Sequence, residues 1–159
     1  MSFDLMTLFT LVHVVLSVLG LIAGLVVAGG LVSGARLDGW TAFFLSTTVA
    51  TSITGYGFPS DKVLPSHIVG AISLVVLALC VFARYGKKLA GGWRRVYVVT
   101  AMTALYLNAF VLMVQLFVKT PALTKLAPTQ QEAPFAVTQG LILLVFAWIG
   151  EKAWRRFRA

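Results

Sequence analysis

Five long apolar runs constrain this sequence more than any other feature. They cover residues 5–33, 40–58, 67–85, 96–118 and 135–154, and most of the charged residues lie between these runs or at the two ends of the chain. A helix needs about 20 mainly apolar residues to cross the roughly 30 Å hydrocarbon core of a bilayer, and each run is close to that length or longer. The sequence therefore predicts an all-α integral membrane protein, in which residues 1–159 form a single membrane domain, a bundle of about five transmembrane helices.

Composition excludes the other broad classes of protein. Hydrophobic residues make up 59% of the chain and charged residues only 11%, whereas an ordinary soluble domain carries about 25% charged residues. Disordered chains are poor in large apolar residues and rich in charge. The formal net charge of +8 would point to nucleic acid in a soluble protein. Here the basic residues lie at the ends of the apolar runs, so the expected partner is the lipid bilayer and no nucleic acid.

The first run could also be a signal peptide, which has a basic leader and an apolar core of about 7–15 residues. Residues 1–4 hold no Lys or Arg, and the run that follows is much longer than such a core. As a helix it would measure about 43 Å, enough to span a bilayer with tilt or overhang. We therefore expect residues 5–33 to be a retained span.

The second run differs from the others in its many hydroxyl side chains, among them Thr47, Thr51 and Thr54. Such hydroxyls can bond to carbonyl groups of their own helix, and they are tolerated in a membrane where they face other helices. The alternative is a segment that dips into the membrane without crossing it. That alternative would break the alternation of charge between the two sides, so a span is predicted.

Lys and Arg are shared unequally between the two sides of a five-span chain. Ten of the thirteen fall on one side, and only Lys62, Lys119 and Lys125 fall on the other. An excess of Lys and Arg marks the cytoplasmic face. The sequence thus predicts an N-terminus outside, a C-terminus in the cytoplasm, and a location in the bacterial cytoplasmic (inner) membrane.

Polar residues inside the spans predict a polar interior. Asn108 and Gln115 lie on one face of the fourth run, and in lipid such side chains need partners, so this face is expected to point inward. Two interpretations stay open. The face is either a hydrogen-bonded clasp between helices or the lining of a polar cavity or path, shared with Thr47, Thr51 and Thr54.

The first run carries a stripe of small residues at helical spacing that includes Gly20 and Gly24. A GxxxG pattern lets another helix backbone come close. We expect it to serve helix packing, either within the chain or in an oligomer. Because so small a bundle encloses little space, a homo-oligomer or a subunit of a larger membrane complex is expected.

His13 and His67 are the two histidines of the chain, and both fall in the outer half of the bilayer in the five-span prediction. A b-type haem held between helices needs two imidazoles, or one imidazole and another axial group, at a similar depth. Haem b is therefore one possible cofactor, with His13 and His67 as its ligands. The other interpretations are two structural histidines, or a His13 that senses protons or contacts a quinone.

Thr54-Gly55-Tyr56-Gly57 resembles the TVGYG filter of potassium channels, which is built from backbone carbonyls of four subunits. A glycine turn that ends a helix accounts for the same residues.

Motifs of known chemistry are absent from the sequence. All five carboxylates fall in loops or at the ends of runs, no metal-ligand spacing occurs, and Cys80 has no second cysteine to pair with. We predict no catalytic residues and no metal site. The predicted function is a non-enzymatic membrane subunit or transport-type bundle with a polar interior. The alternatives are a haem b electron-transfer protein and, third, an interfacial enzyme acting on a lipid or isoprenoid.

Overall fold

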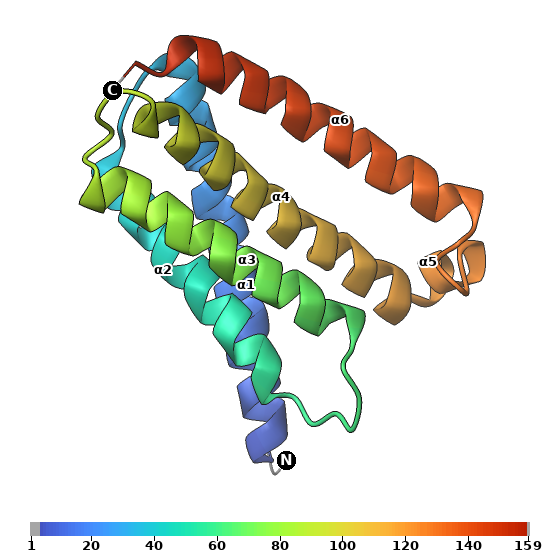
Figure 1. The fold of residues 1–159 in the computed structure, drawn as a ribbon. Helices are drawn as coiled ribbons and strands as arrows, with labels where there is room; N and C mark the ends of the chain where they lie inside the picture. Colours follow the sequence, from blue (N-terminus) through green and yellow to red (C-terminus); the bar gives the residue numbers. More distant parts are fainter. Residues whose placement is uncertain (1–3, 159) are drawn as a thin grey trace.

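The computed structural model describes residues 4–158, and in this part of the chain it is all-helical, without strands. Residues 1–3 and 159 of the predicted domain lie outside the described residues. The elements, in chain order, are α1 (Leu5–Ser33), α2 (Asp38–Thr54), the 3₁₀ turn η1 (Gly55–Gly57), α3 (Pro65–Val81), the π-helical turn η2 (Phe82–Gly86), α4 (Trp93–Lys119), the short α5 (Pro121–Leu126) and α6 (Ala133–Arg156) (Figure 1).

Four helical segments are long and apolar enough to cross a membrane: α1, α3 together with η2, α4 and α6. Each falls on an apolar run of the sequence, and α1 has the predicted bounds. The remaining long helix, α2, has 17 residues and continues directly into the three residues of η1. The fold is therefore a helical bundle with four candidate spanning helices, and α2 is the shorter element that packs among them.

Helix ends follow from local chemistry. The carboxylate of Asp4 accepts a hydrogen bond from the backbone N–H of Thr7 at 2.7 Å, which caps the start of α1. Gly34 ends the same helix with φ of 83°, a left-handed conformation that costs glycine nothing. Pro65 and Pro134 stand in the first turns of α3 and α6, where a missing N–H removes no helical hydrogen bond.

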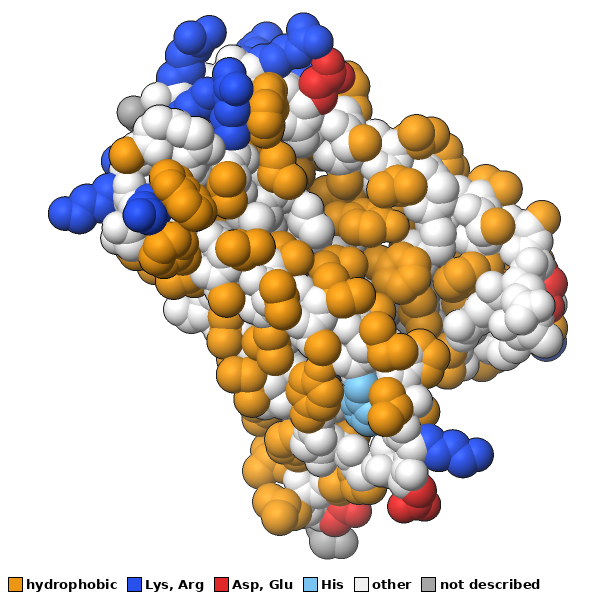
Figure 2. Space-filling model, in the orientation of Figure 1, with side chains coloured by type: hydrophobic (Ala, Val, Ile, Leu, Met, Phe, Trp, Pro, Cys, Tyr) orange, Lys and Arg blue, Asp and Glu red, His pale blue; other side chains and the backbone are white. Residues whose placement is uncertain are grey.

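The helices meet at one end of the bundle, here called the basic end. There the last residues of α1, η2 and α6 lie beside the first residues of α2 and α4. The guanidinium of Arg94 donates to the carbonyl of Phe157, and the backbone of Gly34 lies near the carbonyl of Arg156. Lys and Arg side chains gather at this end, where the chain's C-terminus also lies (Figure 2).

The apolar core sits in the half of the bundle near the basic end. The buried residues of α1 all fall between Gly20 and Leu31, and they pack with Phe44 of α2, Leu77 of α3 and Leu105 of α4. Toward the opposite end the helices diverge, so that α1 and α2 point away from α6 (Figure 1). Large apolar side chains of α1 before Gly20 and along α6 stay exposed, as expected for a surface in contact with lipid.

Candidate functional site

Some of the polar residues singled out in the sequence lie where α1, α2 and α4 meet. Asn108 of α4 is buried and faces Ser17 of α1. Its amide Nδ2 donates to the Ser17 carbonyl at 3.2 Å, and its Oδ1 accepts from the Ser17 hydroxyl at 3.1 Å. This reciprocal pair joins the two helices and satisfies both ends of the Asn108 side chain.

Gly20 and Gly24 bring α1 close to its neighbours. A Cβ added at Gly20 would lie 3.1 Å from the hydroxyl oxygens of Thr47 and Thr48. A Cβ added at Gly24 would lie 2.4 Å from Cδ1 of Leu105 and 2.9 Å from Cε2 of Phe44. The glycine face of α1 therefore packs against α2 and α4 of the same chain, and it is not available to a second copy.

The threonines of α2 turn their hydroxyls back onto their own helix. Thr47 donates to the Phe43 carbonyl at 2.8 Å, and Thr51 donates to the Thr47 carbonyl at the same distance. A hydroxyl bound in this way needs no other partner in an apolar surrounding. Thr48 differs, because its buried hydroxyl has no hydrogen-bond partner among the described residues. Most of the threonine hydroxyls of α2 are thus satisfied by carbonyl groups of α2 itself.

Gln115 lies two turns after Asn108 on α4 and is half-buried. Its side chain makes no hydrogen bond within the described residues, so Asn108 and Gln115 share a helix face without sharing a network. A further amide, which the sequence analysis missed, is buried on α6: Gln139 donates Nε2 to the carbonyl of Phe110 at 3.4 Å. Like Asn108, Gln139 is a polar residue within an apolar run, and this position could have marked it as a residue of the interior.

His13 is held by α2. Its Nδ1 lies 2.7 Å from the hydroxyl oxygen of Thr54, and that hydroxyl donates its only proton to the Ala50 carbonyl at 2.7 Å. The Thr54 hydroxyl also lies 3.2 Å from the carbonyl of Thr51. When it donates to one of these carbonyls, its oxygen accepts from His13, and the neutral ring then carries its proton on Nδ1 and has Nε2 as its acceptor. The edge of Phe58 packs on this imidazole, with ring centroids 5.1 Å apart.

His67 has the opposite arrangement. Its Nδ1 accepts from the backbone N–H of Leu64 at 3.2 Å, so in the neutral ring the proton sits on Nε2. The ring of Tyr56 stacks on it at 5.3 Å, and the Tyr56 hydroxyl donates to the His67 carbonyl at 2.5 Å. His67 thus lies in the first turn of α3 and links this helix to η1. The two histidines contact different residues of the segment 54–58.

The segment that resembles a channel filter forms a helical turn in a single chain. Gly55 has φ of −56° and ψ of −30°, and η1 continues α2. A Cβ added at Gly57 would lie 2.5 Å from the ring of Phe9, so this glycine lets η1 rest against α1. The residues Thr54 to Gly57 serve here as the contact point for both histidines.

Arg84 is the main polar residue that the sequence analysis misplaced. It is one of the ten Lys and Arg that the sequence analysis placed on the cytoplasmic side, yet its side chain is only 1% exposed. Its Nη2 donates to the carboxylate of Asp38 and, at 3.4 Å, to the carbonyl of Arg36. The guanidinium also lies 5.0 Å from the ring centre of Tyr97, and it sits within the π-helical turn η2. An arginine so deeply buried normally requires a paired charge, and Asp38 provides it.

The two acidic residues that precede α1 and α6 at the end opposite the basic end are strongly hydrogen-bonded. The backbone N–H of Thr7 lowers the pKa of the Asp4 carboxyl. The Thr129 hydroxyl, at 2.8 Å, lowers the pKa of the Glu132 carboxyl, with help from the backbone of Thr129 and Gln131. Both carboxylates therefore stay ionised near neutral pH; that of Asp4 caps α1, whereas that of Glu132 binds the loop residues that precede α6. Within the described residues, no three His, Cys, Asp or Glu side chains gather to hold a metal ion.

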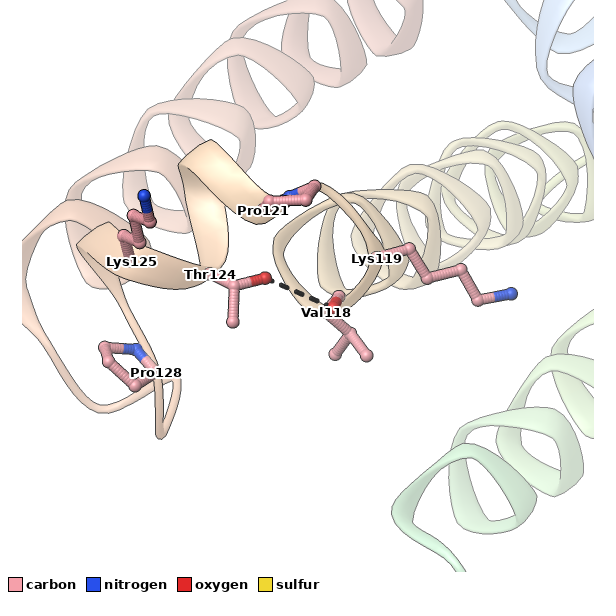
Figure 3. A pocket seen from close by; sticks show the side chains of 6 residues that line it. All are labelled: Val118, Lys119, Pro121, Thr124, Lys125 and Pro128. Atoms are coloured by element: carbon pink, nitrogen blue, oxygen red, sulfur yellow. Dashed lines mark hydrogen bonds between the residues drawn. The ribbon is translucent and has the colours of Figure 1, made fainter.

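Two surface hollows accompany the helices. One, of about 510 Å³, lies beside α5 and is lined by Val118, Lys119, Pro121, Thr124, Lys125 and Pro128. Its two lysines extend in different directions and do not form one cationic site (Figure 3). The other, also about 510 Å³, is an apolar groove along α3 that leads toward the basic end.

Comparison of the chain with protein-family models, with curated proteins and with solved structures finds no match. The class of the protein therefore rests on its own geometry, which is that of a helical bundle with helices apolar enough for a membrane.

Proposed function

We propose that this chain is a non-enzymatic subunit of a membrane assembly, either a homo-oligomer or a larger complex, in the bacterial cytoplasmic membrane. In this proposal α1, α2 with η1, α3 with η2, α4 and α6 all cross the bilayer, the N-terminus lies outside and the C-terminus in the cytoplasm. The gathering of Lys and Arg at the basic end supports this orientation (Figure 2). The five long helices run alternately toward and away from the basic end, which is consistent with it (Figure 1).

The observation that carries the proposal is the reciprocal pair of Ser17 and Asn108. A path for a solute needs polar groups that are free to bind it, whereas this pair and the threonines of α2 other than Thr48 bind one another or their own helix. The polar interior therefore suits holding helices together better than conducting a solute. A transport-type bundle is the alternative version of the proposal, and its uncommitted polar groups include Gln115, the Thr48 hydroxyl and Nε2 of His13.

Replacing Asn108 by leucine is expected to lower the melting temperature of the purified protein by a few degrees. Interhelical hydrogen bonds in membranes average about 0.6 kcal/mol and reach about 1.7 kcal/mol. Gln115→Leu is the matched control and should leave the melting temperature unchanged, because the Gln115 side chain makes no hydrogen bond within the described residues. In sealed vesicles, neither variant nor the unaltered protein should raise the passive flux of protons or small ions above that of empty vesicles.

Two results would contradict this proposal. If the unaltered protein conducts and Asn108→Leu changes the rate, the transport-type version replaces the subunit. If Asn108→Leu changes neither stability nor flux, the polar interior has no role in either.

A haem b electron-transfer protein is the alternative, and the geometry supports only one of its ligands. A haem-ligating histidine donates its second ring N–H to a neighbour, as His13 does to Thr54. The Nδ1 of His67 accepts from Leu64, so the neutral ring carries its proton on Nε2. To bind iron through Nε2, His67 would have to move that proton to Nδ1 and lose its hydrogen bond to the Leu64 N–H at the start of α3. After expression with ample haem, we expect the visible spectrum of the purified protein to be flat. A Soret band that is lost in His13→Ala and His67→Ala would establish the alternative.

A further inference from the structure

The groove along α3 is apolar throughout and opens on the surface of the bundle. It is lined by Val49 of α2, by Leu74, Leu77, Ala78 and Val81 of α3, and by Phe82, Tyr85 and Gly86 of η2. No charged side chain lines it, and its volume is about 510 Å³. Surfaces of this kind bind a hydrocarbon group or lie against lipid.

The length of the groove matches one leaflet of a bilayer. Leu74 and Gly86 lie twelve residues apart in the sequence, which corresponds to about 18 Å of helix. Half of the hydrocarbon core of a bilayer is about 15 Å thick. Because the groove ends at the basic end, a chain lying in it would run from the middle of the membrane to the surface that carries Lys and Arg.

A cation is fixed at the mouth of the groove. The ammonium of Lys87 lies 5.5 Å from the ring centre of Phe82 and 5.7 Å from that of Trp93. These two rings meet edge to face at 5.2 Å, and the Phe82 ring is itself part of the groove wall. Lys87 is therefore held beside the groove, where an anionic group attached to a hydrocarbon chain would come to lie.

Gly86 allows this arrangement. A Cβ added at Gly86 would lie 2.8 Å from Cδ2 of Phe82. Any other residue would therefore displace the Phe82 ring, which lines the groove and contacts the ammonium of Lys87. Tyr85 adds an exposed aromatic side chain at the same level, as is common at the membrane interface.

We propose that the groove along α3 binds one anionic phospholipid of the leaflet at the basic end, with an acyl chain between Leu74 and Gly86 and the phosphate on Lys87. The site rests on the membrane location in the proposed function, but it does not depend on the subunit role or on the orientation of the chain. The contact of Lys87 with Phe82, a ring that also lines the groove, distinguishes the site from the general attraction of a basic surface for anionic lipid.

Native mass spectrometry of the detergent-purified protein tests this site. Phosphatidylglycerol and phosphatidylcholine with the same acyl chains are the probes, and the lipid retained per chain is counted. One lysine near a phosphate contributes about 1 kcal/mol, so we expect the unaltered protein to retain phosphatidylglycerol about fivefold more tightly. Lys87→Gln should bring the ratio close to one, and Ala78→Trp, which fills the groove, should reduce retention of both lipids.

Matched controls separate the groove from surface charge. Lys152 is also a cation on an aromatic ring near the basic end, with its ammonium 3.9 Å from the ring centre of Trp148. Lys152→Gln should behave as the unaltered protein does, and so should Ala147→Trp on the exposed face of α6. Melting temperatures close to that of the unaltered protein would show that each variant is folded.

The proposal is overturned if the unaltered protein retains both lipids equally, or if Lys152→Gln lowers the ratio as much as Lys87→Gln does. It is also overturned if soluble glycerol phosphate displaces the lipid, because a headgroup alone would then account for the binding. The measurement is made in micelles, so it does not depend on the orientation of the chain or on the subunit role. A negative result would reject only the lipid site, and a wrong orientation or subunit role would not reject the lipid site.

Discussion

Gly24→Leu is expected to lower the stability of the bundle severely, whereas Gly29→Leu on the same helix is expected to be tolerated. The Cβ alone would lie 2.4 Å from Cδ1 of Leu105 and 2.9 Å from Cε2 of Phe44. Both of these side chains are 1% exposed, so neither has room to move aside. Overpacking of this kind costs about 3 kcal/mol, and a whole leucine side chain is at the upper end of that effect.

Gly29 provides the matched control. It lies on the exposed side of α1, and a Cβ added there meets nothing within 4 Å. Leucine forms helices better than glycine by roughly 0.8 kcal/mol, so Gly29→Leu should keep or slightly raise the melting temperature. A loss of 3 kcal/mol at Gly24 corresponds to a fall of roughly 10 °C for a chain of this size.

Thermal unfolding of both variants in one detergent, followed by far-ultraviolet circular dichroism, measures the difference. Equal melting temperatures would mean that α1 does not approach α2 and α4 through Gly24. A loss of stability at Gly29 instead would mean that the exposed side of α1 is covered by another element.

The positions of most of the helices could be predicted from the sequence because long apolar runs of this length are typical of helices that can cross a bilayer. Backbone groups in lipid must be satisfied within the segment, so a long apolar run becomes a helix. The run 5–33 and α1 share their bounds, as this reasoning predicts. Helices α4 and α6 extend beyond their runs by a few residues, as α4 does at Trp93, because basic and aromatic residues can remain helical. Helix α2 instead ends at Thr54, before residue 58 where its run ends, and η1 follows it.

The partners within the interior could not be predicted, because they depend on how the helices pack. His13 and Thr54 were both singled out as site candidates, but nothing local joins residues 41 positions apart. The glycine stripe of α1 was equally compatible with an oligomer, and only the packing of Phe44 and Leu105 against it assigns it to the chain itself.

Arg84 shows why hydropathy alone misplaces a charge. An arginine at the end of an apolar run is read as the start of a loop, and its neighbours Lys87 and Lys88 reinforce that interpretation. Its burial depends on the π-helical turn η2 and on Asp38, which stands at the start of α2. Neither the turn nor the ion pair has a signature in the local sequence.

Labelling of single cysteines from the two sides of the membrane tests the central claim, the five-span orientation, most directly. The chain has one cysteine, the buried Cys80, so Cys80→Ala provides the background. Three exposed positions then serve as sites: Gly39→Cys before most of α2, Ser60→Cys between η1 and α3, and Ala90→Cys between η2 and α4.

In intact cells, we expect an impermeant maleimide to label Ser60→Cys and to leave Gly39→Cys and Ala90→Cys unlabelled until the membrane is opened. That pattern would place both α2 and α3 across the bilayer with the basic end in the cytoplasm. Labelling of all three positions from outside, or of Gly39→Cys and Ala90→Cys alone, would contradict the account.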